Sequence, residues 1–364
     1  MLGVYVHIPF CEKKCTYCAF SSFADFSQKE KYITSLCDEI NAFSRKGECV
    51  DTIYFGGGTP STLEPQEIEK ILAAIKNQFN VNSNCEITIE CNPNSITREK
   101  LVFYKKLGIN RLSLGVQSLN DDQLKFAGRL HNAEQAINAL RLAKKVGFEN
   151  VSADLLIGLP GCNYADFEDM LKTLLNEGVK HISTYMLQVE ENTKLKKMID
   201  ENPELMPDDD NMVEILSKTA NFLKKNGFLH YEVSNFALKG YESKHNYKYW
   251  SGEEYVGFGL AAHSFLDGKR IANPSDFKDY FDRKNVFSES LTNDQKIEEH
   301  IMLGLRCNRG ISTRFLKNLG YDIEQNDYFN EFVNKKILIK DGEKIFLAED
   351  YYYVNNFIIV SLLC

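Results

Sequence analysis

The chain has 364 residues, with a hydrophobic content of 43% and a charged content of 26%, as in ordinary globular proteins. The net charge of −8 argues against a nucleic-acid partner, because phosphate-binding surfaces are basic. No apolar run reaches the roughly 18 residues of a membrane span. With no signal peptide before the first strand, and with ten cysteines, we expect a cytoplasmic protein with one large and one smaller domain.

An apolar run at residues 4–8 predicts a first strand, which ends at Pro9. Cys11, Cys15 and Cys18 follow it at C-x3-C-x2-C spacing. Three thiolates on one tight loop can bind three irons of a [4Fe–4S] cluster and leave the fourth iron open, whereas electron-transfer clusters usually have four cysteine ligands. A zinc site would need a fourth ligand nearby, and a disulfide would leave one cysteine over. The spacing therefore predicts an iron–sulfur loop.

Strands and helices then alternate. The predicted helices cover residues 28–43, 65–79, 97–107, 121–146 and 164–176, and the strands cover residues 52–55, 85–91, 111–116, 151–157 and 181–187. Together with the first strand this makes six strand–helix units, which is typical of a parallel α/β sheet. A closed barrel needs eight such units, so we expect an open, partial (β/α)6 barrel with its ligands at the C-terminal ends of the strands.

The regular alternation ends near residue 190. The sequence predicts a long helix at 208–226, strand-like residues at 228–236 and a glycine-rich segment at 255–264. Helical segments then precede a hairpin at 337–347, where an Asp-Gly turn joins two apolar runs. Helices ahead of a hairpin favour a smaller, mostly helical, winged-helix-like C-terminal domain. We expect the domain boundary between 1–265 and 266–364.

Three glycines at 56–58, followed by Thr59, end the second strand. Because glycine has no Cβ, backbone groups there can approach a ligand closely, although a tight turn explains such a run equally well. Glu90 ends the third strand, where a carboxylate can accept hydrogen bonds from an ammonium group or a ribose, or form a salt bridge at the rim.

Three further polar residues lie at or after the fourth and fifth strands. Gln117 follows the fourth strand, and Arg129 lies twelve residues later. A guanidinium can clamp a carboxylate, but a lone arginine usually faces solvent. Asp154 interrupts an apolar strand, which is costly unless the acid is paired, so we expect its side chain to face a site.

The cysteine spacing, with Tyr17 directly before the third cysteine, resembles the radical S-adenosylmethionine (SAM) superfamily. The string YVHIPFC, which begins at Tyr5, is similar to the oxygen-independent coproporphyrinogen III oxidases and their relatives, the HemW heme chaperones. This resemblance implies a partial radical SAM barrel, one [4Fe–4S] cluster, SAM at its open iron, and a small reductant protein of the flavodoxin or ferredoxin type. It implies cofactor-binding roles for Tyr5, Tyr17, Gly57, Gly58, Thr59, Glu90, Gln117, Arg129 and Asp154.

Two departures from the oxidases favour the chaperones. The oxidases usually have an extra cysteine where this chain has Phe20, and a long extension before the string that begins here at Tyr5. The segment HNYKYW, which begins at His245, matches the H-N-x-x-Y-W motif of HemW proteins. The match implies that His245 binds heme iron beside the flat rings of Tyr249 and Trp250, although an isolated histidine is more often hydrogen-bonded within a loop.

The sequence therefore predicts a heme chaperone that passes heme to apo heme proteins. The alternative is an active oxygen-independent coproporphyrinogen III oxidase, which would decarboxylate its substrate oxidatively. His263, in the glycine-rich segment, is expected to have a structural or site-lining role.

Overall fold

The structure is a computed structural model that describes residues 1–206 and 208–363. Six strands form its centre: β1 (Leu2–Ile8), β2 (Cys49–Gly57), β3 (Asn80–Cys91), β4 (Arg111–Gln117), β5 (Asn150–Ile157) and β6 (His181–Met186). Each is parallel to its neighbour. The six parallel strands confirm the predicted partial barrel.

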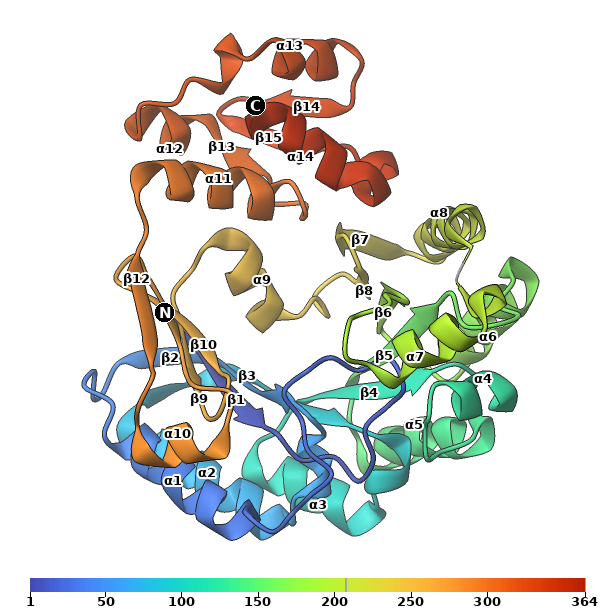
Figure 1. Cartoon of the computed structure of the whole chain (residues 1–364), viewed down its shortest axis with the longest axis vertical. Coiled ribbons are helices and arrows are strands. Elements are labelled where there is room, and N and C mark those ends of the chain that lie inside the picture. The colour runs from blue at the N-terminus through green and yellow to red at the C-terminus, as the bar shows by residue number, and fades with distance from the viewer. Residues whose placement is uncertain (207, 364) are drawn as a thin grey trace.

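Helices follow these strands and cover one face of the sheet (Figure 1). They are α1 (Lys29–Asn41), α2 (Pro65–Gln78), α3 (Arg98–Leu107), α4 (Asp121–Phe126), α5 (Ala133–Val146) and α6 (Tyr164–Asn176). Local sequence signals set their ends. For example, the Thr97 side chain accepts a hydrogen bond from the backbone of Lys100 at the start of α3, and Gly108 ends that helix with φ of +95°.

The sheet continues beyond the six parallel strands on both sides. The added strands are β7 (Phe228–Glu232), β8 (Asn235–Leu238), β9 (Tyr255–Phe258), β10 (His263–Leu266), β11 (Lys269–Ala272) and β12 (Phe287–Ser290). Their order is β12-β11-β10-β9-β1-β2-β3-β4-β5-β6-β8-β7, so the sheet stays open among the described residues. The strand-like segment at 228–236 is a hairpin of two antiparallel strands, β7 and β8.

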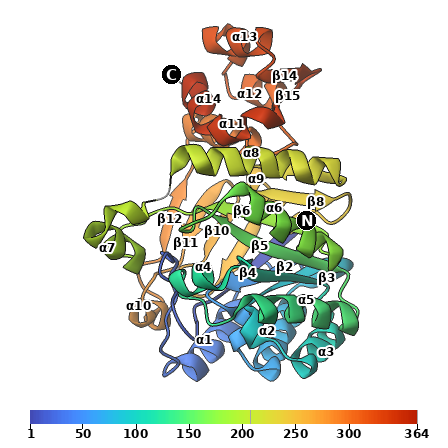
Figure 2. The ribbon, with the colours of Figure 1, turned by 90° about the vertical axis from the view of Figure 1, so that its right-hand side faces the viewer.

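Helices α7 (Lys194–Glu201) and α8 (Asp209–Lys225) lead from β6 to β7, α9 (Lys244–Ser251) lies between β8 and β9, and α10 (Phe277–Asp282) lies between β11 and β12. Helix α8 confirms the long helix predicted at 208–226, and Figure 2 shows it between the sheet and the C-terminal domain. The HNYKYW segment lies on α9. None of the helices that the structure describes is both long and apolar enough to cross a membrane.

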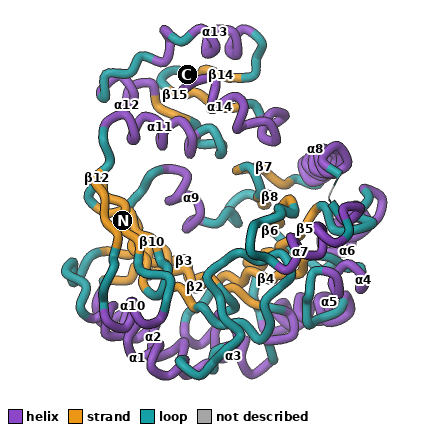
Figure 3. Tube along the Cα trace, viewed as in Figure 1, coloured by secondary structure: helices purple, strands orange, loops and turns teal. Residues whose placement is uncertain are grey.

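The C-terminal domain has its own hydrophobic core, which begins at Ile297. Its elements are α11 (Asn293–Gly304), β13 (Ile311–Ser312), α12 (Thr313–Asn318), α13 (Asp327–Asn334), β14 (Leu338–Asp341), β15 (Lys344–Leu347) and α14 (Asn355–Leu363). Helices predominate around a small sheet of order β13-β15-β14, as the winged-helix-like prediction requires (Figure 3). Strands β11 and β12 belong to the large sheet. The domain boundary between 1–265 and 266–364 stays a prediction.

Candidate functional site

A cavity of about 720 Å³ opens at the C-terminal ends of the parallel strands. This is the edge at which ligands gather in parallel α/β folds. The cavity brings together the residues expected at the cluster and SAM sites, apart from Tyr5. These lining residues are Cys11, Cys15, Tyr17, Cys18, Gly57, Gly58, Thr59, Glu90, Gln117, Arg129 and Asp154.

The cysteine loop is held by backbone hydrogen bonds to distant segments. The Cys11 amide donates to the Phe23 carbonyl at 3.0 Å, and the Thr16 amide donates to the Ala127 carbonyl at 3.0 Å. Burial raises the pKa of the Cys11 and Cys18 thiols, so a bound metal has to displace their protons. The loop is therefore positioned by the fold before any metal binds.

The donor set fits a cluster better than a single ion. Across the described residues, no three His, Cys, Asp or Glu side chains converge on one ion. The three thiols instead line the wall of one cavity. Three thiols around a larger space suit a [4Fe–4S] cluster with one open iron.

The glycine run after β2 packs against β1. A Cβ on Gly57, whose φ is +107°, would lie 2.5 Å from the ring of His7. A Cβ on Gly58 would lie 2.8 Å from two backbone carbonyl oxygens. Glycine is required here because the backbone lies close to β1 and to the residues directly after it. The Thr59 hydroxyl lies 3.4 Å from the Cys11 sulfur.

Two acidic residues, Glu90 and Asp154, face the cavity and differ in their hydrogen-bond partners. Glu90 accepts hydrogen bonds from the Tyr54 hydroxyl at 2.8 Å and the Gly57 amide at 3.2 Å. Burial, together with the charge of the nearby Asp154, raises the pKa of Glu90 to about 7. Asp154 accepts hydrogen bonds from three serine hydroxyls, on Ser113, Ser152 and Ser183. These hydroxyls supply the pairing that an acid inside an apolar strand needs.

Arg129 reaches across the cavity to the cluster loop. One terminal nitrogen lies 3.3 Å from the Cys15 sulfur, and the other donates to the Gly115 carbonyl at 2.8 Å. Its Nε is buried and has no partner among the described residues. Burial acts to lower the pKa of Arg129, but the Cys15 thiol beside it raises the pKa overall. Gln117 lies nearby with φ of +65°, an unusual conformation for a residue other than glycine.

Several lining residues were missed from the sequence. Asn92 accepts a hydrogen bond from Arg129, and its position directly after a strand was an available signal. Gln188, near which the sequence led us to expect only backbone contacts from the last strand, also lines the cavity. Four more lie in or beside the 3-10 helix η5 (Glu349–Val354) of the C-terminal domain, and no local pattern brings them to the barrel: Tyr352, Tyr353, Asn355 and Asn356.

His245 lies away from this cavity and is fully buried. Its Nδ1 is 2.8 Å from the Thr52 hydroxyl, and its Nε2 is 2.9 Å from the Tyr249 hydroxyl. Burial lowers the pKa of His245 to about 3, so its ring is neutral. Both ring nitrogens are therefore engaged within the fold, and Trp250 packs with a separate aromatic cluster rather than beside His245.

Tyr5 lies just outside the cysteine-lined cavity. Its ring stacks on Tyr54 at a centroid distance of 6.2 Å, and Tyr54 bonds to Glu90. Tyr5 itself lines a second cavity on the other side of the cluster loop.

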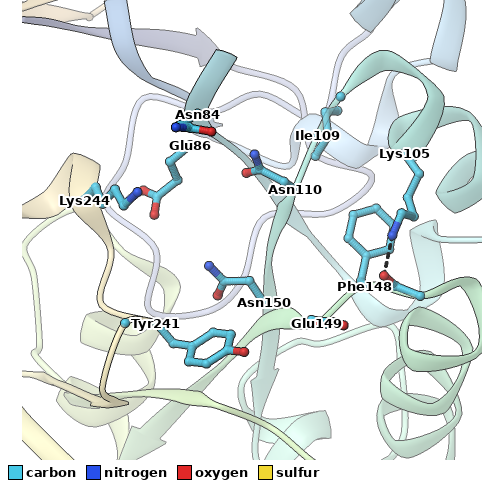
Figure 4. A pocket seen from close by; sticks show the side chains of 13 residues that line it. Asn84, Glu86, Lys105, Ile109, Asn110, Phe148, Glu149, Asn150, Tyr241 and Lys244 are labelled. Carbon is cyan, nitrogen blue, oxygen red and sulfur yellow. Dashed lines mark hydrogen bonds between the residues drawn. The ribbon is translucent and has the colours of Figure 1, made fainter. Parts of the chain in front are cut away.

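A third cavity, of about 490 Å³, opens at the opposite, N-terminal ends of the strands (Figure 4). Polar side chains surround it, including Glu86 of β3, Asn110 directly before β4 and Asn150 of β5, with Lys105 and Lys244 at its sides. None of the three motif cysteines lines it. Ligands of parallel α/β folds bind at the other end of the strands, so this cavity is not the expected cofactor site.

The open parallel barrel and the cysteine-lined cavity at its strand ends define a radical SAM protein. Residues 5–174 match the model of the Radical SAM superfamily. The chain is 36% identical over 335 residues to heme chaperone HemW of Bacillus subtilis, covering 89% of this chain and 88% of the relative. It is 34% identical over 362 residues to heme chaperone HemW of Lactococcus lactis, covering 97% and 95%. The chain belongs to the HemW family.

A solved structure has the same fold. Coproporphyrinogen III oxidase (HemN) from Escherichia coli superposes with a TM-score of 0.85, covering 99% of this chain and 89% of that chain. The sequence identity is 22%, so this likeness shows the fold and not the activity.

Proposed function

We propose that the protein is a heme chaperone that binds heme and delivers it to apo heme proteins. Its HemW relatives are named for this function. The observation that supports the proposal most is the position of the HNYKYW helix. Tyr249 of that helix and Phe20, two residues after Cys18, line one cavity, so the heme motif and the cluster loop are neighbours.

In this proposal Cys11, Cys15 and Cys18 hold a [4Fe–4S] cluster, and SAM binds in the cavity beside it. The cluster and SAM supply one-electron chemistry when they are bound. Arg129 binds the SAM carboxylate, because its guanidinium lies beside the thiols. Glu90 accepts a hydrogen bond from the amino group or the ribose of SAM.

The remaining predicted residues complete the SAM site. Gln117 and Asp154 close the wall formed by β4 and β5, while Tyr17 covers the cluster loop. Gly57, Gly58 and Thr59 contact the amino end of SAM. Tyr5 supports Glu90 from behind through Tyr54.

The proposed setting is the cytoplasm, with a flavodoxin- or ferredoxin-type protein as reductant. The nine described cysteines are free thiols, as is usual in a reducing compartment. Lys13 and Lys14 are exposed on the cluster loop and offer positive charge to an acidic reductant.

The test combines heme binding and heme transfer. Anaerobically reconstituted protein is titrated with hemin, and the complex is then mixed with apomyoglobin. We expect a Soret band on titration, followed by transfer to apomyoglobin. Absence of hemin binding would refute the chaperone function. Conversion of coproporphyrinogen III to protoporphyrinogen IX by the same protein with SAM and reductant would establish the oxidase instead.

A further inference from the structure

The cavity beside Tyr5 has a volume of about 740 Å³ and is lined by aromatic side chains from separate elements. They are Tyr5, Phe20, Tyr249, Tyr255 and Phe287. Phe20 is 71% exposed and Phe287 is 54% exposed. Gathered exposed aromatic rings mark a binding surface, and this volume lies within the range of cofactor sites.

His263, the first residue of β10, lies in this cavity and is exposed. The chain has seven histidines, and the structure describes all of them. Six have a ring nitrogen hydrogen-bonded within the fold: His7, His131, His181, His230, His245 and His300. No hydrogen bond joins the ring of His263 to any other residue that the structure describes. It is therefore the one described histidine with an available imidazole that lines an aromatic cavity.

We infer that His263 is the axial ligand of heme iron and that the aromatic cavity around it holds the porphyrin. The inference rests on the proposed heme binding and names its site. Histidine is the usual protein ligand of heme iron, and aromatic rings pack well against a flat macrocycle. Ser275 and Asn285 on the cavity wall offer polar groups to the propionates.

This assignment gives the HNYKYW motif a different role from iron ligation. The hydrogen bond from His245 holds Tyr249, whose ring forms part of the cavity wall. His245 could reach iron only after breaking its bond to the Tyr249 hydroxyl and leaving a fully buried position. His245 is therefore a positioning residue for Tyr249.

The aromatic cavity adjoins the cysteine-lined cavity. Ala19 and Phe20, which follow Cys18 directly, line both. Phe20, at the position of the oxidases' extra cysteine, thus lies in the wall between the aromatic cavity and the cysteine-lined cavity. Its ring is available to a porphyrin on one side of the cluster loop.

The test compares hemin with metal-free protoporphyrin IX in the full-length reconstituted protein. His263→Ala should weaken hemin binding by about tenfold or more, since even outer-shell partners of a metal ligand have effects of that size. It should also shift the Soret band and change the iron electron paramagnetic resonance signal, and added imidazole should restore both. Binding of metal-free protoporphyrin IX should not change, because that ligand forms no iron bond.

Two further variants separate the possibilities. His245→Ala should weaken the binding of both hemin and metal-free protoporphyrin IX, because Tyr249 loses its hydrogen bond to His245. The hemin complex of this variant should keep its axial-histidine signal. His300→Ala, in the C-terminal domain, is the matched control and should leave the spectrum unchanged. If His245→Ala removes the axial signal and His263→Ala does not, the inference is wrong but the chaperone function stands. If the wild-type protein binds no hemin, the proposed function itself fails.

Discussion

Arg129→Ala is the most direct perturbation of the proposed SAM site. The guanidinium lies 3.3 Å from the Cys15 sulfur and is fixed by hydrogen bonds to Asn92 and to the Gly115 carbonyl at 2.8 Å. Its orientation is therefore set before SAM binds, and little side-chain entropy is lost on binding. The Nε of Arg129 is buried and has no hydrogen-bond partner in the part of the chain that the structure describes, which leaves donor capacity for a ligand.

Removing a hydrogen bond between charged partners costs about 1.5–3 kcal/mol, which corresponds to about 10- to 150-fold weaker SAM binding. Arg129→Lys should lose part of this affinity, because an ammonium keeps the charge but not the planar fork that matches a carboxylate. The order of SAM affinity should be wild type, then the lysine variant, then the alanine variant.

The assay is isothermal titration of anaerobically reconstituted protein with SAM, with iron content measured on the same samples. The iron measurement matters because Arg129 also touches Cys15. Arg141→Ala is the matched control, since that arginine is 61% exposed and paired with Glu177 on the outer surface. Unchanged SAM affinity in Arg129→Ala at full iron content would exclude Arg129 from the site.

Three further variants test other parts of the structure. Replacing Cys11, Cys15 and Cys18 together by alanine should abolish cluster iron and visible absorption, and retained iron would refute the assignment. Gly58→Ala should lower the melting temperature by costing about 1–3 kcal/mol, because its Cβ would meet backbone oxygens at 2.8 Å. Burial raises the pKa of Glu232 from 4.5 to about 7, so the folded state favours the protonated carboxyl group. The stability that this preference contributes is fully present below pH 4.5 and is lost as the pH rises through 7. In Glu232→Gln the melting temperature should fall less between pH 5 and pH 8 than it does in the wild type. An equal fall in both proteins would contradict this role of Glu232.

The sequence predicts the six parallel strands because long apolar runs alternate with helical spacing. The short strands β9 to β12 were not predicted, because they depend on distant partners rather than on their own pattern. For example, Gly3 of β1 pairs with Tyr255 of β9, across most of the chain. Residues 228–236 show the same limit: they were expected as one strand-like segment, and Asn235 instead begins a second strand that pairs back on β7.

Some residues of the candidate site could likewise be predicted from the sequence, and others could not. Glu90, Gln117 and Asp154 were predictable because strand ends in a parallel sheet share one edge. The burial of His245 was not, since it depends on Thr52 of a strand far earlier in the chain. Nor could the sequence place Tyr352 at the cavity, because that residue arrives with the packing of the C-terminal domain.

The open barrel explains how one fold can offer two neighbouring sites. The sheet passes from β1 to β9 instead of closing, and the cluster loop follows β1. The loop therefore stands between the cysteine-lined cavity and the aromatic cavity, with Phe20 in both walls. A porphyrin on His263 would contact the segment next to Cys18. Any influence of the cluster on heme affinity must then be matched by an equal influence of heme on cluster binding, because coupling between two sites is reciprocal.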